Sequence, residues 1–81
     1  MHHDPPDIHL ERCQPALNMA RFYQLSVETS LFGEPVLTRR WGRIGTRGRV
    51  VCEAFASREG ALAALHDHET RKLRRGYRRR P

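Results

Sequence analysis

The apolar residues of this 81-residue chain gather into short blocks separated by turn-forming residues, a pattern that few folds satisfy. The clearest block is residues 20–28, where polar and apolar residues alternate as in a β-strand with one buried face. A turn with Gly33 and Pro35 leads to a second strand at 36–44, and two glycines then allow a tight connection to a third at 49–56. Strands joined by such short turns are typical of an antiparallel meander.

The sequence also predicts one strand before the meander and one helix after it. Ile8 and Leu10 alternate within residues 8–13, which suits a short strand. Residues 58–75 contain no proline and are rich in alanine, leucine and glutamate, with Ser57 in place as an N-cap. The predicted fold is therefore α+β, a small antiparallel sheet of about four strands with one long C-terminal helix packed across one face.

The predicted helix has an imperfect apolar stripe, because Glu69 interrupts it and His68 lies at its edge. We interpret His68 as packed at the edge of the core, and Gly76 as the residue that ends the helix. The acidic residues of the helix precede its basic last turn, and this order of charges stabilises the helix dipole. The cations of the last turn can therefore have a structural role. The stripe itself consists of Ala61, Leu62, Leu65 and Leu73.

The length admits one domain, since independent domains usually run to ~50–200 residues. We expect residues 1–7 to be a flexible leader, residues 8–77 to form the domain and residues 78–81 to be a basic tail. No apolar run approaches the ~20 residues of a membrane span, and no export signal is recognisable. We expect a cytoplasmic protein without a membrane partner, associated with the nucleoid if it binds DNA.

The net charge of +6 conceals two cationic blocks on an acidic body. Residues 39–49 carry five arginines and no acid, and residues 71–81 carry six arginines, one lysine and no acid. Arginine supplies 14 of the 15 cations, and its planar guanidinium binds phosphate bidentately. A GC-rich genome would explain arginine in place of lysine, but not the clustering. The charge pattern predicts an anionic partner, with phosphate as the leading chemistry.

No catalytic or metal-binding set is recognisable in the sequence. Cys13 and Cys52 lie 39 residues apart without CxxC spacing, and we interpret both as reduced thiols. His66 and His68 are two positions apart on the predicted helix, whereas paired helical metal ligands prefer a spacing of four. No nucleophile, base and orienting group occur together. We expect no enzyme activity, no metal and no cofactor.

The single tryptophan, Trp41, lies within the first arginine block. On a regular strand its side chain shares a face with Arg39 and Arg43, while Arg40 and Gly42 point to the other face. A flat ring between two cations is the arrangement that sequence-independent nucleic-acid binding uses. The alternative is that Trp41 is a core residue beneath the helix, because large aromatic side chains are usually buried.

A second candidate surface follows the helix, where Tyr77 precedes Arg78–Arg80. The alternative for these residues is a disordered basic tail that increases affinity for any polyanion without choosing the site. The two interpretations are compatible.

Around Trp41-Gly42-Arg43 the sequence resembles the WGR domain, a module of DNA-damage-responsive poly(ADP-ribose) polymerases and of small bacterial proteins. The resemblance covers residues 8–77 and implies the same fold, a sheet with a helix across one face. A chain of this length has no room for the polymerase domains, so their chemistry is not implied. The matching residues are Asn18, Arg21-Phe22-Tyr23, Thr38-Arg39-Arg40-Trp41-Gly42-Arg43-Ile44-Gly45, Gly48, Phe55, Lys72 and Gly76-Tyr77.

The resemblance implies binding to DNA, and in the polymerases this module grips the end of a broken strand. Trp41 would stack on the sugar or base of a terminal nucleotide, and Arg43 would contact either phosphate or a separate protein. A protein-interaction module that docks a larger partner through Trp41 and Arg43 is therefore the alternative, and RNA would suit the same chemistry. The candidate nucleic-acid-binding residues are Asn18, Arg21, Arg39, Arg40, Trp41, Arg43, Arg47, Arg49 and Tyr77.

Overall fold

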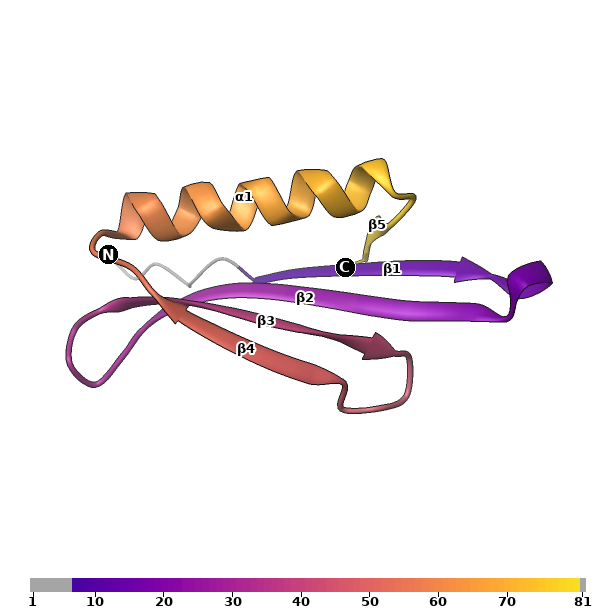
Figure 1. Ribbon diagram of the computed structural model, residues 1–81, viewed down its shortest axis with the longest axis horizontal. Coiled ribbons are helices and arrows are strands. Elements are labelled where there is room, and N and C mark those ends of the chain that lie inside the picture. Colours follow the sequence, from indigo (N-terminus) through magenta and orange to yellow (C-terminus); the bar gives the residue numbers. More distant parts are fainter. Residues whose placement is uncertain (1–6, 81) are drawn as a thin grey trace.

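The computed structural model describes residues 7–80 and places one helix across one face of a five-stranded antiparallel sheet (Figure 1). The α+β prediction is confirmed, with five strands in place of about four. The strand order is β4-β3-β2-β1-β5. The elements are β1 (Asp7–Gln14), the 3-10 helix η1 (Pro15–Leu17), β2 (Met19–Thr29), β3 (Pro35–Arg43), β4 (Arg49–Ala54), α1 (Arg58–Arg74) and β5 (Arg78–Arg80).

At both ends of the domain, residues that were expected to lie outside it form strands of the sheet. Asp7, assigned to the leader, begins β1 and pairs with Ser26 of β2, whereas residues 1–6 of that leader lie outside the described residues. Arg78–Arg80, assigned to the basic tail, form β5 antiparallel to β1, so the alternative of a disordered tail is wrong for these three residues. The chain can return to the sheet because Gly76 adopts a φ of 97° directly after the helix.

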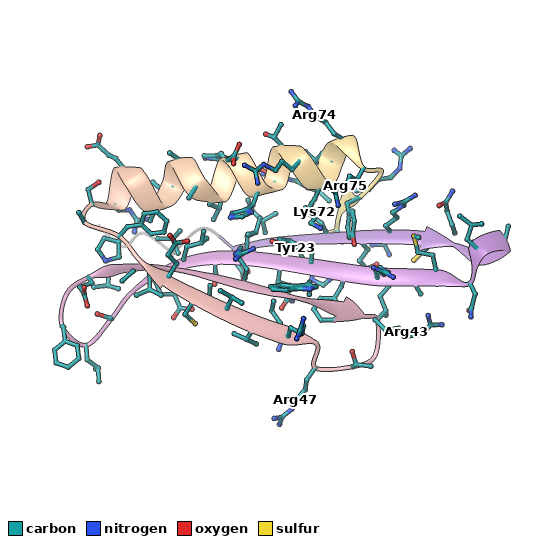
Figure 2. All side chains as sticks on the ribbon, in the orientation of Figure 1. Tyr23, Arg43, Arg47, Lys72, Arg74 and Arg75 are labelled. Atoms are coloured by element: carbon teal, nitrogen blue, oxygen red, sulfur yellow. The ribbon has the colours of Figure 1, made fainter. Side chains whose placement is uncertain are left out.

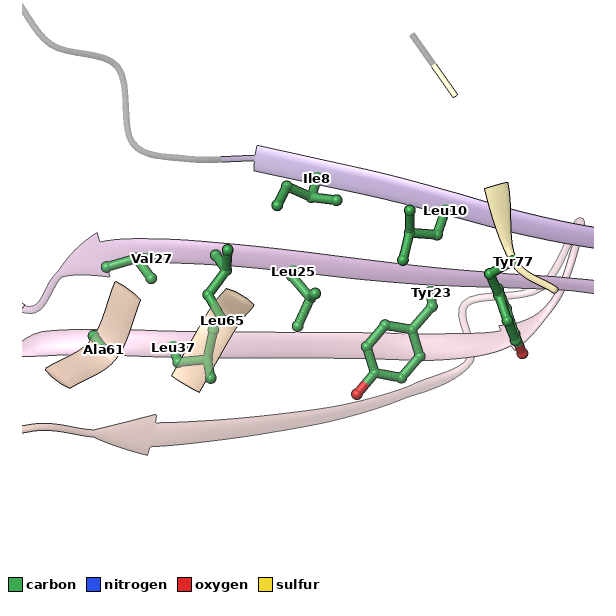
Figure 3. Packing of buried hydrophobic residues seen from close by; sticks show 9 residues of the cluster. All are labelled: Ile8, Leu10, Tyr23, Leu25, Val27, Leu37, Ala61, Leu65 and Tyr77. Carbon is green, nitrogen blue, oxygen red and sulfur yellow. The ribbon is translucent and has the colours of Figure 1, made fainter. Parts of the chain in front are cut away.

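The core lies between α1 and the face of the sheet that the helix covers (Figure 3). As the alternation of β2 predicts, Tyr23, Leu25 and Val27 all point to this face and are buried. Ala61 and Leu65 of α1 pack against them. The inner face of the sheet is apolar beneath the first half of the helix and becomes aromatic and cationic beneath its last turns.

The helix begins and ends where the sequence predicts, and its buried stripe includes the predicted Ala61 and Leu65 but differs toward the C-terminal end. The Ser57 hydroxyl accepts a hydrogen bond of 3.0 Å from the Gly60 N–H, which confirms the N-cap. Leu73, predicted to be apolar core, is 43% exposed, whereas Glu69 is only 6% exposed. Glu69 tolerates burial because the Arg79 guanidinium of β5 donates to its carboxylate.

The turn between β2 and β3 holds two fully exposed apolar side chains, Leu31 and Phe32. The Ser30 hydroxyl accepts hydrogen bonds of 3.2 Å from the N–H groups of Phe32 and Glu34, so the turn is ordered. This turn lies at the end of the molecule where α1 begins, opposite the basic last turn of the helix (Figure 1). Phe32 therefore offers an aromatic side chain remote from Trp41.

Three further features of residues 7–80 concern a membrane span, the cysteines and metal binding. Their one α-helix is neither long enough nor apolar enough to cross a membrane. Cys13 and Cys52 are exposed free thiols on β1 and β4, two strands that β2 and β3 separate. Across this same part of the chain, no three His, Cys, Asp or Glu side chains gather where they could hold a metal ion.

Candidate nucleic-acid interface

Trp41 is half-buried on the inner face of the sheet, near the end of β3. Its Cα partners are Tyr23 on β2 and Arg49 on β4. The Trp41 and Tyr23 rings stack with centroids 5.8 Å apart and an interplanar angle of 22°. The tryptophan therefore packs against the core along one side and leaves other parts of its ring accessible, so it combines features of both sequence interpretations.

Two hollows flank Trp41. The first, which we call the helix-side hollow, has a volume of about 310 Å³ and lies between β3 and α1. The second, the strand-end hollow, has a volume of about 330 Å³ and lies toward the ends of β2 and β3. Trp41 and Lys72 line both. The helix-side hollow is completed by Tyr23, Arg39, His68, Arg71 and Arg75, and the strand-end hollow by Arg21, Gly42, Arg43 and Tyr77.

The two hollows are lined by cations and, among residues 7–80, by no carboxylate. Burial lowers the pKa of Lys72, and the positive charges of Arg75, Arg21 and Arg39 lower it further. Because like charges surround Lys72, the electrostatic potential in the two hollows is positive. The arrangement therefore favours an anionic ligand, as the charge pattern predicts.

The Lys72 ammonium connects the helix to the aromatic part of the inner face. Its Nζ atom lies 4.7 Å from the centroid of the Tyr23 ring and 5.3 Å from that of Tyr77. Figure 2 shows Lys72 directed from α1 toward the sheet, while Arg74 points away from it. Cation–π contacts replace a counter-ion for this lysine, which leaves its charge available to a ligand.

Arg39 contacts both side chains of the stacked pair, Tyr23 and Trp41. Its guanidinium carbon lies 5.5 Å from the centroid of Trp41, and its Nη1 donates to the Tyr23 hydroxyl at 3.3 Å. These contacts position Arg39 at the base of the helix-side hollow, where it belongs to the lining. The prediction that Arg39 shares a face with Trp41 is confirmed.

Asn18 and Arg43, 25 residues apart in the sequence, come together in the structure. The Arg43 guanidinium donates to the backbone carbonyl and to the side-chain oxygen of Asn18, both at 3.3 Å. Asn18 adopts a left-handed conformation, with a φ of 50°, at the end of η1. Asn18 thereby orients Arg43 at the rim of the strand-end hollow.

His68 lines the helix-side hollow, opposite Arg39 and Trp41. The expectation of a half-buried position near the core edge is confirmed, but the sequence gives no sign of the hollow beside it. Burial lowers the pKa of His68, as do the charges of Arg39 and Arg71. The imidazole is therefore neutral at pH 7 and can both donate and accept a hydrogen bond.

The remaining predicted residues are less central. Arg40 lies on the opposite face of the sheet, where its guanidinium covers the Phe22 ring at 5.7 Å and donates to Gln24 at 2.9 Å. Arg47 is exposed in the turn between β3 and β4 (Figure 2). Arg49 is exposed on the edge strand β4. Tyr77, predicted to form a second surface with the tail, is only 8% exposed and belongs to the core.

Gly42 and Gly48 allow the turn between β3 and β4 to pack closely against the backbone of β3. A Cβ atom on Gly42 would lie 2.8 Å from the Cα atom of Gly48, and one on Gly48 would collide with the carbonyl oxygen of Trp41. Gly48 also has a φ of 71°. The turn between β3 and β4 therefore folds tightly against the backbone of Trp41, and this fixes where the ring lies.

Five residues that line the helix-side hollow were absent from the predicted site: Tyr23, His68, Arg71, Lys72 and Arg75. The sequence does show Arg71, Lys72 and Arg75 as a basic last turn of the helix. Because cations in that position also stabilise the helix dipole, they did not by themselves indicate a binding site. Their place opposite Trp41 depends on how the helix packs across the sheet.

The fold and the two hollows together define the class of protein: a small α+β domain whose sheet carries an aromatic and cationic surface beside its helix. The chain matches the WGR domain over residues 6–81 and belongs to that family of nucleic-acid-binding modules. It is also similar to the uncharacterized protein y4dW of Sinorhizobium fredii (strain NBRC 101917 / NGR234), with 44% identity over 77 residues. That match covers 95% of this chain but 38% of y4dW, so the chain spans well under half the length of this relative. No solved structure matches the chain.

Proposed function

We propose that this chain binds DNA at strand ends or breaks and that it does so without catalysing a reaction. The observation that carries the proposal is the pair of hollows around Trp41, which six arginine and lysine side chains line. Guanidinium and ammonium groups bind phosphate oxygens, and an aromatic ring beside them offers a stacking surface for a sugar or base.

The recessed position of Trp41 favours an end over the interior of a duplex. The ring is half-buried between β3 and the last turns of α1. In the interior of a duplex the faces of the bases are covered by their neighbours. A terminal nucleotide presents an uncovered base face and sugar, so it can approach a recessed ring while its phosphate meets the surrounding cations.

The strand-end hollow suits the terminal nucleotide. Arg21 and Arg43 supply cations at its rim, and Arg43 is oriented by two contacts to Asn18. Lys72 provides a cation from the opposite wall. We propose that these three side chains contact the terminal phosphates and that Trp41 stacks on the sugar or base. Arg47 and Arg49 would extend the contact along the duplex.

The test is a titration of linear blunt-ended DNA and of closed circular DNA of the same sequence. End binding predicts that the linear DNA competes far better per molecule than the circle, since the circle offers no terminus. Equal competition at equal nucleotide concentration would contradict end binding and leave only general binding to phosphates. An RNA duplex of the same sequence, used as competitor, distinguishes DNA from RNA as the preferred ligand.

The alternative, a module that docks a protein through Trp41 and Arg43, has less support. Arg43 already donates to Asn18, and six cations line the hollows without a carboxylate among residues 7–80, which suits the phosphates of a polyanion. Retention of one specific protein at high salt after nuclease treatment, abolished by Trp41→Ala, would favour this alternative.

A further inference from the structure

The terminal nucleotide proposed above lies in the strand-end hollow, and no part of the DNA has yet been assigned to the helix-side hollow. Trp41 separates it from the strand-end hollow, because Arg39 precedes the tryptophan on β3 and Arg43 follows it. The two hollows share two lining residues, Trp41 and Lys72, and are therefore adjacent.

The size of the helix-side hollow limits what it can hold. Its volume of about 310 Å³ is at the lower end of the ~300–1,000 Å³ range of small-ligand sites. Its walls are β2 and β3 on one side and the last two turns of α1 on the other, with His68 and Arg75 on the helical wall. A space of this size admits one nucleotide, but not a base pair with its two backbones.

The chemistry of the hollow suits a base as well as a phosphate. Tyr23 and Trp41 offer aromatic surface, and the neutral imidazole of His68 can donate to or accept from the edge of a base. Lys72 and Arg75 supply positive charge for the backbone, and no carboxylate of residues 7–80 lines the space to repel it. Single-stranded nucleic acid is commonly bound by this combination of aromatic side chains and cations.

We infer that the helix-side hollow binds one unpaired nucleotide that extends beyond the duplex, so that ends with an overhang are the preferred ligand. The inference rests on the proposed function, because the paired terminal nucleotide occupies the strand-end hollow on the other side of Trp41. His68 contacts the unpaired base and is the residue that distinguishes an overhang from a blunt end.

The experiment measures the affinity of the full chain for one short duplex with three kinds of end. The ends are blunt, or carry one unpaired nucleotide at the 5′ or at the 3′ side. Binding is followed by the fluorescence of Trp41, the only tryptophan of the chain, which reports directly on the ring between the hollows. The expected result is at least about fivefold tighter binding of one of the two overhangs, the lower limit for one stacked base.

Two histidine variants identify the hollow that is responsible. His68→Ala is expected to abolish the preference for the overhang and to leave the affinity for the blunt duplex unchanged. His66→Ala is the matched control, because His66 lies two residues away with a 67% exposed side chain and does not line the hollow. Thermal unfolding of both variants verifies the fold, and His68→Gln replaces His68→Ala if the latter unfolds.

The outcomes separate this inference from the proposed function. Equal affinity for blunt and overhanging ends would overturn the inference and leave end binding intact. A preference that survives His68→Ala and His68→Gln would also overturn it, because the unpaired nucleotide would then lie elsewhere. Failure of the blunt duplex to compete better than closed circular DNA would instead contradict the proposed function.

Discussion

The Nζ atom of Lys72 lies 4.7 Å from the centroid of the Tyr23 ring, and this contact joins the last turns of the helix to the sheet beside Trp41. Tyr23 stacks in turn on Trp41. The lysine therefore contributes a charge to both hollows while its stem packs on aromatic side chains. Its role in binding and its role in stability can be separated by substitution.

Lys72→Met retains an apolar stem of similar length and removes the charge. We expect weaker DNA binding and a reduction of about 0.9 in the slope of log affinity against log salt, because the ammonium no longer neutralises one phosphate. The free energy of unfolding should change by less than about 1 kcal/mol, since a cation–π interaction at a partly exposed site stabilises by that amount or less. Lys72→Arg is the control that keeps the charge. An unchanged salt slope for Lys72→Met would exclude Lys72 from the phosphate contacts.

The salt dependence of the unmodified protein tests the importance of phosphate contacts. If about four phosphates are contacted, log affinity should fall with log salt at a slope near −3.6. The measurement is a titration of blunt duplex at several salt concentrations. An affinity independent of salt would contradict the proposed binding mode, because six cations line the hollows and phosphate is their expected ligand.

The pairing of Glu69 with Arg79 makes stability depend on pH. The hydrogen bond from Arg79 lowers the pKa of Glu69 and outweighs its burial, which acts in the opposite direction. Because the folded-state pKa is below the unfolded value, this stabilisation is fully present above pH ~4.5 and is lost as pH falls through the lowered pKa. Glu69→Gln should therefore lower the Tm at pH 7 but much less below that pKa.

Thermal unfolding across this pH range measures the effect, and Glu34→Gln, in the exposed turn between β2 and β3, is the control. A decrease in Tm for Glu69→Gln that stays constant down to strongly acidic pH would show that the carboxylate charge is not what stabilises β5. An undiminished Tm at pH 7 would contradict the pairing itself.

The N-cap of the helix provides a stability change that should leave binding intact. Ser57→Ala removes the hydrogen bond to the Gly60 N–H and should cost about 1 kcal/mol of unfolding free energy. Ser57 lies at the start of α1, whereas the hollows are lined by its last two turns. Chemical denaturation and a DNA titration together test this, and a clear loss of affinity would show that the two ends of the helix are coupled.

The sequence predicts those parts of the fold that local patterns determine. The alternation in β2 places Tyr23, Leu25 and Val27 on one face, and the structure buries all three beneath the helix. The exception is β5, since a run of three arginines has no strand-forming pattern. It pairs with β1 because Tyr77 is buried beside it and Arg79 reaches Glu69, and both contacts depend on the tertiary structure.

The candidate site was predicted in part for the same reason. Arg39, Trp41 and Arg43 share a face because successive side chains of a strand alternate, which the sequence alone establishes. Lys72 and His68 come from a segment about 30 residues away, and they meet Trp41 only when the helix packs across the sheet. Their spacing on the helix gives no sign of which residues they face.

The central claim is that Trp41 binds the end of a DNA strand, and one pair of titrations tests it most directly. The affinity of the full chain and of Trp41→Ala is measured for linear blunt DNA and for closed circular DNA, with Phe32→Ala as the matched aromatic control at the far end of the molecule. We expect Trp41→Ala to lose the preference for linear DNA and Phe32→Ala to retain it. Equal losses on linear and circular DNA would contradict the claim and reduce Trp41 to a residue of the core.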